Sequence, residues 1–202
     1  MSGRGRFIVL DGVDGCGKST QAERLVRRLR ERGAVQHLRE PGSTALGERV
    51  RTLVLERGLD VRPAAEVLLF LAARRQMLEE RVAPALESGA HVVCERFHGS
   101  TFAYQAVAGG LDEGAVLELL VGWAGEPSPD LELVLELDVC VAAARRGAAR
   151  DRIEDRGLDF QRRVAAGFAR YAERVPSVTC LDAAGAPDVV AAAVFAEVAR
   201  VL

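Results

Sequence analysis

The chain has 202 residues, of which 49% are hydrophobic and 28% charged, and its formal net charge at pH 7 is −2. This length and composition suit one globular domain with its own core, and they exclude disordered, collagen-like and small disulfide-stabilised proteins. The slightly negative charge argues against a general nucleic-acid-binding protein, because such domains are usually basic. All but one of the 27 lysine and arginine residues are arginines, and the exception is Lys18. Because arginine is used at every other basic position, the single lysine indicates that Lys18 has a role that arginine does not fill.

Short apolar runs alternate with amphipathic helical patterns along the chain, which predicts a parallel sheet with crossover helices. We expect strands at residues 7–11, 35–39, 91–95, 131–137 and 178–181. Helices are expected at residues 18–32, 46–55, 64–87, 113–124, 139–146, 160–174 and 187–202. Ligands bind beyond the carboxyl ends of the strands in such sheets, so the chemistry is expected just after residues 11, 39, 95 and 137.

The four cysteines lie far apart without a C-x-x-C pair, and the three histidines have no metal-ligand spacing with them. We therefore expect reduced cysteines in a cytoplasmic protein. The amino-terminal apolar run is too short for a signal peptide, and no apolar stretch of about 18 residues follows. Neither secretion nor a membrane partner is expected.

Residues 12–19 read Gly-Val-Asp-Gly-Cys-Gly-Lys-Ser and match the phosphate-binding pattern G-x-x-x-x-G-K-[ST]. Glycines let successive backbone N–H groups turn toward phosphate oxygens, and the following helix adds partial positive charge at its N-terminus. Lys18 is expected to reach the β- and γ-phosphates of a nucleoside triphosphate, and Ser19 to bind Mg²⁺. The predicted nucleotide-binding residues are Gly12, Val13, Asp14, Gly15, Cys16, Gly17, Lys18, Ser19 and Thr20.

The loop alone does not distinguish a kinase from a GTPase or a motor ATPase. A GTPase normally reads guanine with an Asn-Lys-x-Asp motif, which a chain with no asparagine and one lysine does not contain. A RecA-like or AAA ATPase needs a longer core and usually an acidic pair after a central strand, where this chain has Glu95 and Arg96. Both classes therefore fit poorly.

Several further segments resemble the thymidylate kinase family, in the order that the family has them. Residues 39–44 (REPGST) are similar to its R-E-P-G-G-T loop, and residues 47–51 (GERVR) to its G-E-x-x-R helix start. Residues 70–75 (FLAARR) resemble its F-x-x-x-R helix face, and residues 95–105 (ERFHGSTFAYQ) its D-R-Y-x-D-S-x-x-A-Y-Q segment. Residues 151–154 (DRIE) resemble the lid of the bacterial members.

The resemblance runs over most of the chain and implies an α/β fold of the P-loop NTPase type. Such a fold has three layers, with a five-stranded parallel sheet flanked by helices. One kinase domain over residues 1–202 is implied, with a short arginine-rich lid at about residues 145–157 and a homodimer formed through packed helices. The implied reaction is transfer of the γ-phosphoryl group from ATP to dTMP, with Mg²⁺ as cofactor.

The resemblance also implies an acceptor site made of Asp14, Glu40, Arg51, Phe70, Arg74, Arg96, Ser100, Thr101, Tyr104 and Gln105. Phe70 and Arg74 are four residues apart, so a helix would present an aromatic platform and a planar donor on one face. By the same resemblance, the two arginines 51 and 96 bind the phosphate of dTMP, and Tyr104 crowds the 2′ carbon of the sugar. The polar residues 100, 101 and 105 contact thymine or its surroundings.

The acceptor is itself a phosphate anion, so catalysis requires positioning and charge neutralisation rather than a deprotonating base. The expected catalytic residues are Lys18, Arg96 and Arg152, with Arg150 and Arg156 as further lid candidates. The expected Mg²⁺ ligands are Ser19, Asp11 and Glu95. Asp11 stands where the family has Glu, and Glu95 where it has Asp, which suggests a reciprocal exchange that preserves one metal site.

A third departure is Gly99, where the family often has Asp.

Two alternative functions stay open. One is a related kinase for another deoxynucleoside monophosphate or for a nucleoside, which would keep the loop but differ around Arg74, Tyr104 or Gln105. The other is a nucleotide-binding regulatory protein without catalysis, for which the exchange of Asp11 and Glu95 is the only hint.

Overall fold

The computed structural model describes residues 3–145 and 152–202. These residues form a sheet of five parallel strands in the order β2-β3-β1-β4-β5. The strands are β1 (Phe7–Gly12), β2 (Val35–Arg39), β3 (His91–Glu95), β4 (Leu131–Glu136) and β5 (Val178–Asp182). The predicted α/β class with a five-stranded parallel sheet is confirmed, and each strand lies within one residue of its predicted bounds.

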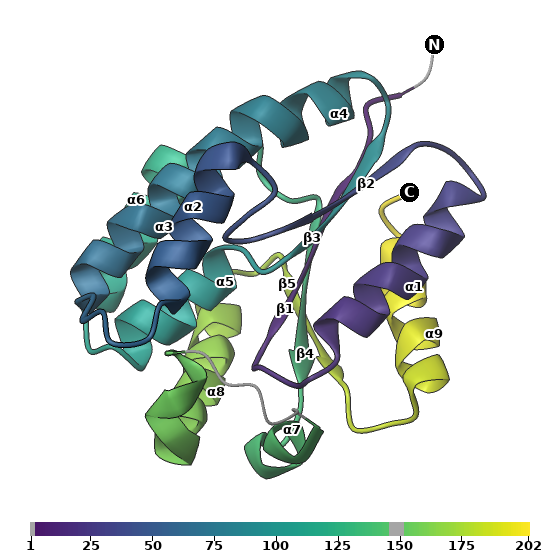
Figure 1. The fold of residues 1–202 in the computed structure, drawn as a ribbon. Helices are drawn as coiled ribbons and strands as arrows, with labels where there is room; N and C mark the ends of the chain where they lie inside the picture. The colour runs from purple at the N-terminus through teal and green to yellow at the C-terminus, as the bar shows by residue number, and fades with distance from the viewer. Residues whose placement is uncertain (1–2, 146–151) are drawn as a thin grey trace.

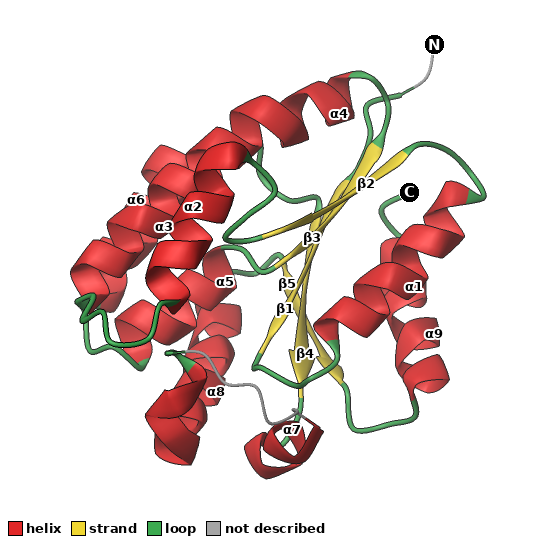
Figure 2. Ribbon diagram, in the orientation of Figure 1, coloured by secondary structure: helices red, strands yellow, loops and turns green. Residues whose placement is uncertain are grey.

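Helices cover both faces of the sheet and give the three layers seen in Figures 1 and 2. One face is covered by α1 (Lys18–Arg30) and α9 (Pro187–Val198). The other is covered by α3 (Pro63–Met77), α4 (Ala83–Glu87), α5 (His98–Thr101), α6 (Glu113–Ala124) and α8 (Gly157–Arg174). Outside α3 lies α2 (Ala45–Leu55), and α7 (Val139–Arg145) follows β4.

The central strand β1 explains why residues 7–10 are all apolar. Ile8 and Leu10 are buried in the cluster that includes α1 and α9, whereas Phe7 and Val9 are buried in the cluster on the opposite face. A strand covered on both faces needs apolar side chains at every position rather than at alternate ones. This burial fixes β1 at the middle of the sheet and places the phosphate-binding loop at its carboxyl end.

The helix expected over residues 64–87 is interrupted by a π-helical turn at Leu78–Val82, between α3 and α4. Pro84 has no backbone N–H, and its ring would clash with the carbonyl group four residues earlier in a regular helix. The wider turn just before it accommodates the ring, with Ala83 N–H donating to the Leu78 carbonyl oxygen. Other helices differ from prediction only at their ends: α1 and α9 stop earlier, α2 begins one residue earlier, and α8 begins at Gly157.

Sequence analysis missed the helical segment formed by α5 and the π-helical turn Phe102–Val107. Most of its side chains are buried, so the segment has no alternation of polar and apolar faces to reveal it. It packs so closely against α8 that a Cβ on Gly167 would lie 2.7 Å from the Ala103 Cα. Glycine at this position therefore permits the contact that holds residues 98–107 beside the sheet.

The carboxyl ends of the inner strands meet at one edge, because Leu10 of β1 and Arg39 of β2 are both in register with Glu95 of β3. The loops that follow these three strands therefore converge, as the sequence predicts for an open parallel sheet. Within the described ranges, no helix combines the length and apolar character needed to cross a membrane.

Candidate active site

The phosphate-binding loop requires glycine at the two fixed glycine positions of its pattern. Gly12 and Gly17 have φ angles of 134° and 100°, in the region that glycine enters without strain. A Cβ on Gly12 would also lie 2.5 Å from the Leu135 carbonyl oxygen. Because α1 begins directly at Lys18, the partial positive charge of its N-terminus lies at the loop, as an anion site requires.

Lys18 lies along this loop rather than in solvent, with 7% of the residue exposed. Its Nζ donates hydrogen bonds to the carbonyl oxygens of Gly12, at 2.9 Å, and Val13, at 2.8 Å. A compact ammonium with three donors fits between two loop carbonyls, whereas a guanidinium is larger and planar. The single lysine of the chain is therefore at a position whose space favours lysine over arginine.

A hydroxyl and a carboxylate meet at the start of α1. Ser19 Oγ donates to Glu95 Oε2 at 2.5 Å, and His37 Nε2 lies 3.0 Å from Glu95 Oε1. Burial opposes ionisation of Glu95, but the hydrogen bonds from His37 and Ser19 prevail and lower its pKa. Ser19 and Glu95 thus offer two oxygen donors of the kind that Mg²⁺ prefers, directly beside the P-loop. Sequence analysis did not single out His37, whose closeness to Glu95 follows from the pairing of β2 with β3.

The structure does not bring Asp11 to this pair, so the three residues expected as one metal set are not gathered here. The Asp11 carboxylate is fully buried and accepts four hydrogen bonds. The donors are the backbone N–H groups of Gly12 (2.9 Å), Phe97 (3.1 Å) and Ser100 (2.8 Å), and the Ser100 hydroxyl (2.6 Å). With these donors Asp11 ties the P-loop to the segment after β3.

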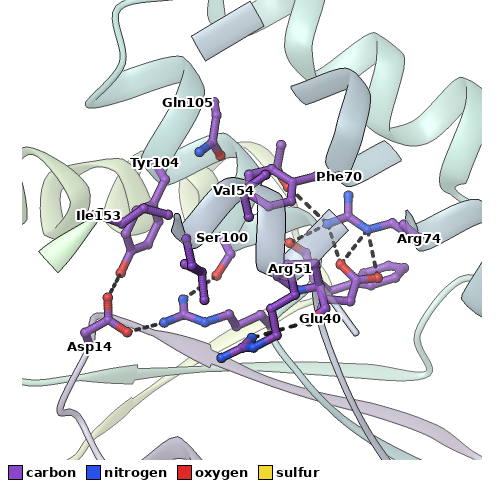
Figure 3. Close-up of a pocket in the computed structure, with 15 residues that line it drawn as sticks. Asp14, Glu40, Arg51, Val54, Phe70, Arg74, Ser100, Tyr104, Gln105 and Ile153 are labelled. Carbon is purple, nitrogen blue, oxygen red and sulfur yellow. Dashed lines mark hydrogen bonds and ion pairs between the residues drawn. The ribbon is translucent and has the colours of Figure 1, made fainter. Parts of the chain in front are cut away.

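A cavity of about 190 Å³ opens beside the P-loop (Figure 3). It is lined by Asp14, Glu40, Pro41, Arg51, Val54, Leu55, Phe70, Arg74, Arg96, Phe97, Ser100, Thr101, Tyr104, Gln105 and Ile153. All ten residues that the sequence assigned to an acceptor site are in this set, although they come from segments 90 residues apart. The structure therefore brings them together around one space.

One end of the cavity is cationic and lies next to the P-loop. Arg96 forms an ion pair with Asp14 and donates to Ser100 Oγ at 3.0 Å, while Tyr104 donates to the other Asp14 oxygen at 2.8 Å (Figure 3). Burial opposes ionisation of Arg96, but Asp14 outweighs it and raises the pKa of the guanidinium. The φ angle of Arg96 is 67°, which is unusual for a residue with a side chain and typical of functional sites.

The other end carries an aromatic ring and a buried ion pair. Arg74 Nε lies 2.8 Å from Glu40 Oε2, and Arg74 Nη2 lies 2.6 Å from the same oxygen. Arg74 Nη2 also donates to the Phe97 carbonyl oxygen and to Thr101 Oγ1, both at 3.0 Å. Nη1 is buried and has no hydrogen-bond partner among the described residues. Phe70, one helical turn away on α3, lines the same cavity.

A buried carboxylate that the sequence analysis missed forms the back of this end. Glu66 is fully buried and binds Gln105 Nε2 at 2.8 Å, Arg156 Nη2 at 3.1 Å, and Arg152. It precedes Phe70 and Arg74 by four and eight residues, so helical spacing would have placed it on the same face as the site.

This contact places the predicted lid arginine away from the P-loop. Arg152 is bound to Glu66 and, through Nε, to the Val54 carbonyl oxygen at 2.9 Å. In this structure the Arg152 side chain is therefore held by Glu66 and Val54 rather than by the P-loop. Arg150 lies outside the described residues.

Gly99 faces two carboxylates. A Cβ there would lie 3.1 Å from Asp11 Oδ2 and 3.2 Å from Glu132 Oε1. Burial raises the pKa of Glu132 to about 8, Asp11 adds to the effect, and the Tyr171 hydroxyl donates to Glu132 Oε2 at 3.0 Å. An Asp at position 99 would crowd a third carboxyl group into this space, which explains why glycine fits here.

Comparisons with known proteins agree with the geometry. The family model for thymidylate kinase matches residues 10–194. A thymidylate kinase of Thermomicrobium roseum is 44% identical over 201 residues, which cover 97% of this chain and 95% of that protein. One from Deinococcus radiodurans is 41% identical over 202 residues, with 98% of each chain covered. One from Chlamydia muridarum is 43% identical over 175 residues, 84% of this chain and 86% of its own.

Proposed function

The chain belongs to the thymidylate kinase family, and from this premise we propose that it transfers the γ-phosphoryl group of ATP to dTMP, giving dTDP and ADP. The observation that carries the proposal is a P-loop that adjoins a cavity with two chemically different ends. The cationic end, with Arg96 and Arg51, suits the phosphate of a monophosphate. The other end, with Phe70 and Arg74, suits the flat face and polar edge of a base.

In this reaction a phosphate oxygen of dTMP forms a bond to the γ-phosphorus as the bond from that phosphorus to the leaving ADP oxygen breaks. The nucleophile is already an anion, so this chain's residues need only position the two phosphates and offset their charge. Lys18 would leave the loop carbonyls for the β- and γ-phosphate oxygens. Arg96 would hold the acceptor phosphate while Asp14 keeps its guanidinium in place. A role for Arg152 requires that it exchange Glu66 for the transferred group.

Mg²⁺ fits the donors that lie at the start of α1. The described residues contain no cluster of three or more acidic, histidine or cysteine side chains for a metal, and Mg²⁺ in kinases typically takes one or two protein oxygens, with phosphate and water oxygens completing the shell. Ser19 and Glu95 would supply those oxygens. The ion would draw negative charge from the phosphate oxygens of ATP.

The proposal is tested by measuring ADP release with a panel of nucleoside monophosphates at saturating ATP. We expect turnover to be highest with dTMP, and equal activity on dTMP and UMP would contradict the proposal. Arg96→Ala, purified in the same way, is the matched control, because it removes the cation of the acceptor site and should abolish turnover. Activity that survives in Arg96→Ala would come from a contaminating kinase or from another site.

The same panel tests the two alternatives. A preference for another deoxynucleoside monophosphate or a nucleoside would identify a related kinase. ATP binding without turnover on any acceptor would indicate a regulatory protein, although the P-loop contacts and the cavity favour catalysis.

A homodimer and a cytoplasmic location complete the proposed function. On the neighbouring helices α3 and α6, Leu68 is 62%, Val121 62% and Trp123 74% exposed. Large exposed apolar side chains on neighbouring helices commonly mark an interface between chains, and the family resemblance makes a second copy of this chain the expected occupant. The four cysteines are all free, which supports a reducing compartment.

A further inference from the structure

Glu66 holds a position that the proposed reaction does not use. The residue lies on α3 with no exposed surface, behind the wall of the cavity rather than in it. Its carboxylate binds two guanidinium groups, those of Arg152 and Arg156, and the amide of Gln105. The arginines provide the charge that a buried carboxylate needs. The contact with Gln105 has a different consequence, because Gln105 does line the cavity.

The contact determines which way round the Gln105 amide lies. A carboxylate paired with two guanidinium groups accepts hydrogen bonds and donates none. Gln105 therefore turns its NH₂ group to Glu66, with Nε2 2.8 Å from Oε2. The opposite orientation would set the amide oxygen against carboxylate oxygens, with no proton between them. The remaining atom, Oε1, has no hydrogen-bond partner among the described residues and is left as an acceptor for a bound molecule.

An acceptor at Gln105 Oε1 matches one pyrimidine and not the other. Thymine carries an N3–H donor next to its O4 acceptor, whereas cytosine carries an N3 acceptor next to a 4-amino donor. Gln105 lines the cavity together with Phe70 and Arg74, which form its base-sized end (Figure 3). We propose that Glu66 is a specificity-determining positioning residue: by orienting the Gln105 amide, it makes the cavity accept thymine and reject cytosine.

The inference rests on the proposed function, and it adds a residue that touches no substrate. A site built to hydrogen-bond one pattern of donors and acceptors rejects the reversed pattern strongly, because its own polar groups are then left opposed or unpaired. Discrimination of that kind is lost when the amide is free to turn. Glu66→Gln would permit the turn, since a glutamine can donate to Gln105 Oε1 as readily as it accepts from Nε2.

The test compares kcat/KM for dTMP and dCMP in the wild type and in Glu66→Gln. We expect the ratio of the two values to fall by about 10-fold or more in the variant, chiefly through a lower KM for dCMP. Arg156→Gln is the matched control, because it removes an ion pair from Glu66 but leaves the acceptor oxygens in place. It should lower both values in proportion and leave their ratio unchanged.

A purely structural role for Glu66 predicts a different result, with both values reduced equally in Glu66→Gln, and that result would overturn the inference. If Glu66→Gln does not fold, Gln105→Met provides the second measurement, since an unchanged dTMP-to-dCMP ratio there would also overturn it. Failure of the proposed function is distinguishable, because the wild type itself would then show no turnover of dTMP.

Discussion

Arg74 and Glu40 form an ion pair that is almost completely shielded from water, with Nη2 2.6 Å from Oε2. The pair connects α3 to the loop after β2, and it holds the guanidinium against the ring of Phe97, 4.8 Å away. Burial raises the pKa of Glu40, and Arg74 opposes that rise. The two partners therefore differ in one respect: the carboxyl group can take up a proton, whereas the guanidinium keeps its charge.

This difference predicts distinct pH profiles for two variants. Glu40→Gln leaves Arg74 without its ion-pair partner and removes the titrating carboxyl group, so it should lower the free energy of unfolding by about 3–5 kcal/mol near neutral pH. Arg74→Met leaves Glu40 with a still higher pKa than in the wild type. Since a folded-state pKa above the unfolded value of 4.5 means that the folded state binds more protons, stability should then fall as the pH rises above 4.5. Urea denaturation at several pH values measures both, and parallel profiles would contradict the prediction.

Lys18→Arg should fold normally and lose phosphoryl transfer by about 100-fold or more, because a planar guanidinium does not reproduce the compact charge between the loop and the phosphates. Turnover and a thermal melt of the same preparation check the two halves of the prediction. Arg27→Lys, an exposed change on the same helix, is the control and should leave both unchanged. Turnover near the wild-type value in Lys18→Arg would show that the single lysine is incidental.

The two carboxylates once expected at one metal site should behave differently. Glu95→Gln should raise the Mg²⁺ concentration needed for half-maximal rate by about 10-fold, because it weakens one of two oxygen donors. Asp11→Asn should instead lower stability, since an amide NH₂ then faces backbone donors. Its remaining activity should keep the wild-type Mg²⁺ dependence. If Asp11→Asn instead shifted the Mg²⁺ dependence of the rate, Asp11 would be a metal ligand and this prediction would be wrong.

Glu132 should make the protein less stable as the pH rises from about 6.5 to about 8. Its folded-state pKa of about 8 lies above the usual 4.5, so the folded state binds more protons in this window and loses stability as they leave. Burial lowers the pKa of His98 to about 3 and that of His91 below 6.5. The two histidines therefore change the free energy of unfolding below pH 6.5, outside the window in which Glu132 is tested. Glu132→Gln should flatten the profile between pH 6.5 and 8. An unchanged slope in chemical denaturation would contradict this.

The proposed dimer should depend on the exposed apolar side chains of the neighbouring helices α3 and α6. Leu68→Glu combined with Trp123→Glu should place charges in a buried interface and convert the protein to a monomer in analytical ultracentrifugation. Val189→Glu is the matched control, because Val189 is 64% exposed on α9, across the sheet from that face. A wild-type protein that sediments as a monomer, or a double variant that stays dimeric, would rule out this interface.

Local patterns in the sequence were enough to identify the strands and the phosphate-binding loop, and resemblance to a family supplied ten of the fifteen residues that line the cavity. Strand positions follow from runs such as residues 7–10, whose burial on both faces demands apolar side chains. The loop follows from glycine spacing, since Gly12 and Gly17 adopt backbone angles open to few other residues. The cavity residues followed from resemblance to a family, and Phe70 and Arg74 also from helical spacing.

What the tertiary structure decided is how charges pair between segments far apart in the chain. The sequence assigned Asp11 and Glu95 to the same metal site. In the fold, Asp11 accepts hydrogen bonds from backbone N–H groups, whereas Glu95 accepts one from the Ser19 hydroxyl. Sequence analysis did not single out Glu66 and placed Arg152 in a lid, whereas the fold joins the two in an ion pair. Helical periodicity reports which face a residue occupies, but the partner on that face comes from another element. A buried charge has the same letter in the sequence as an exposed one, so only the folded arrangement distinguishes a residue that touches substrate from one that positions it.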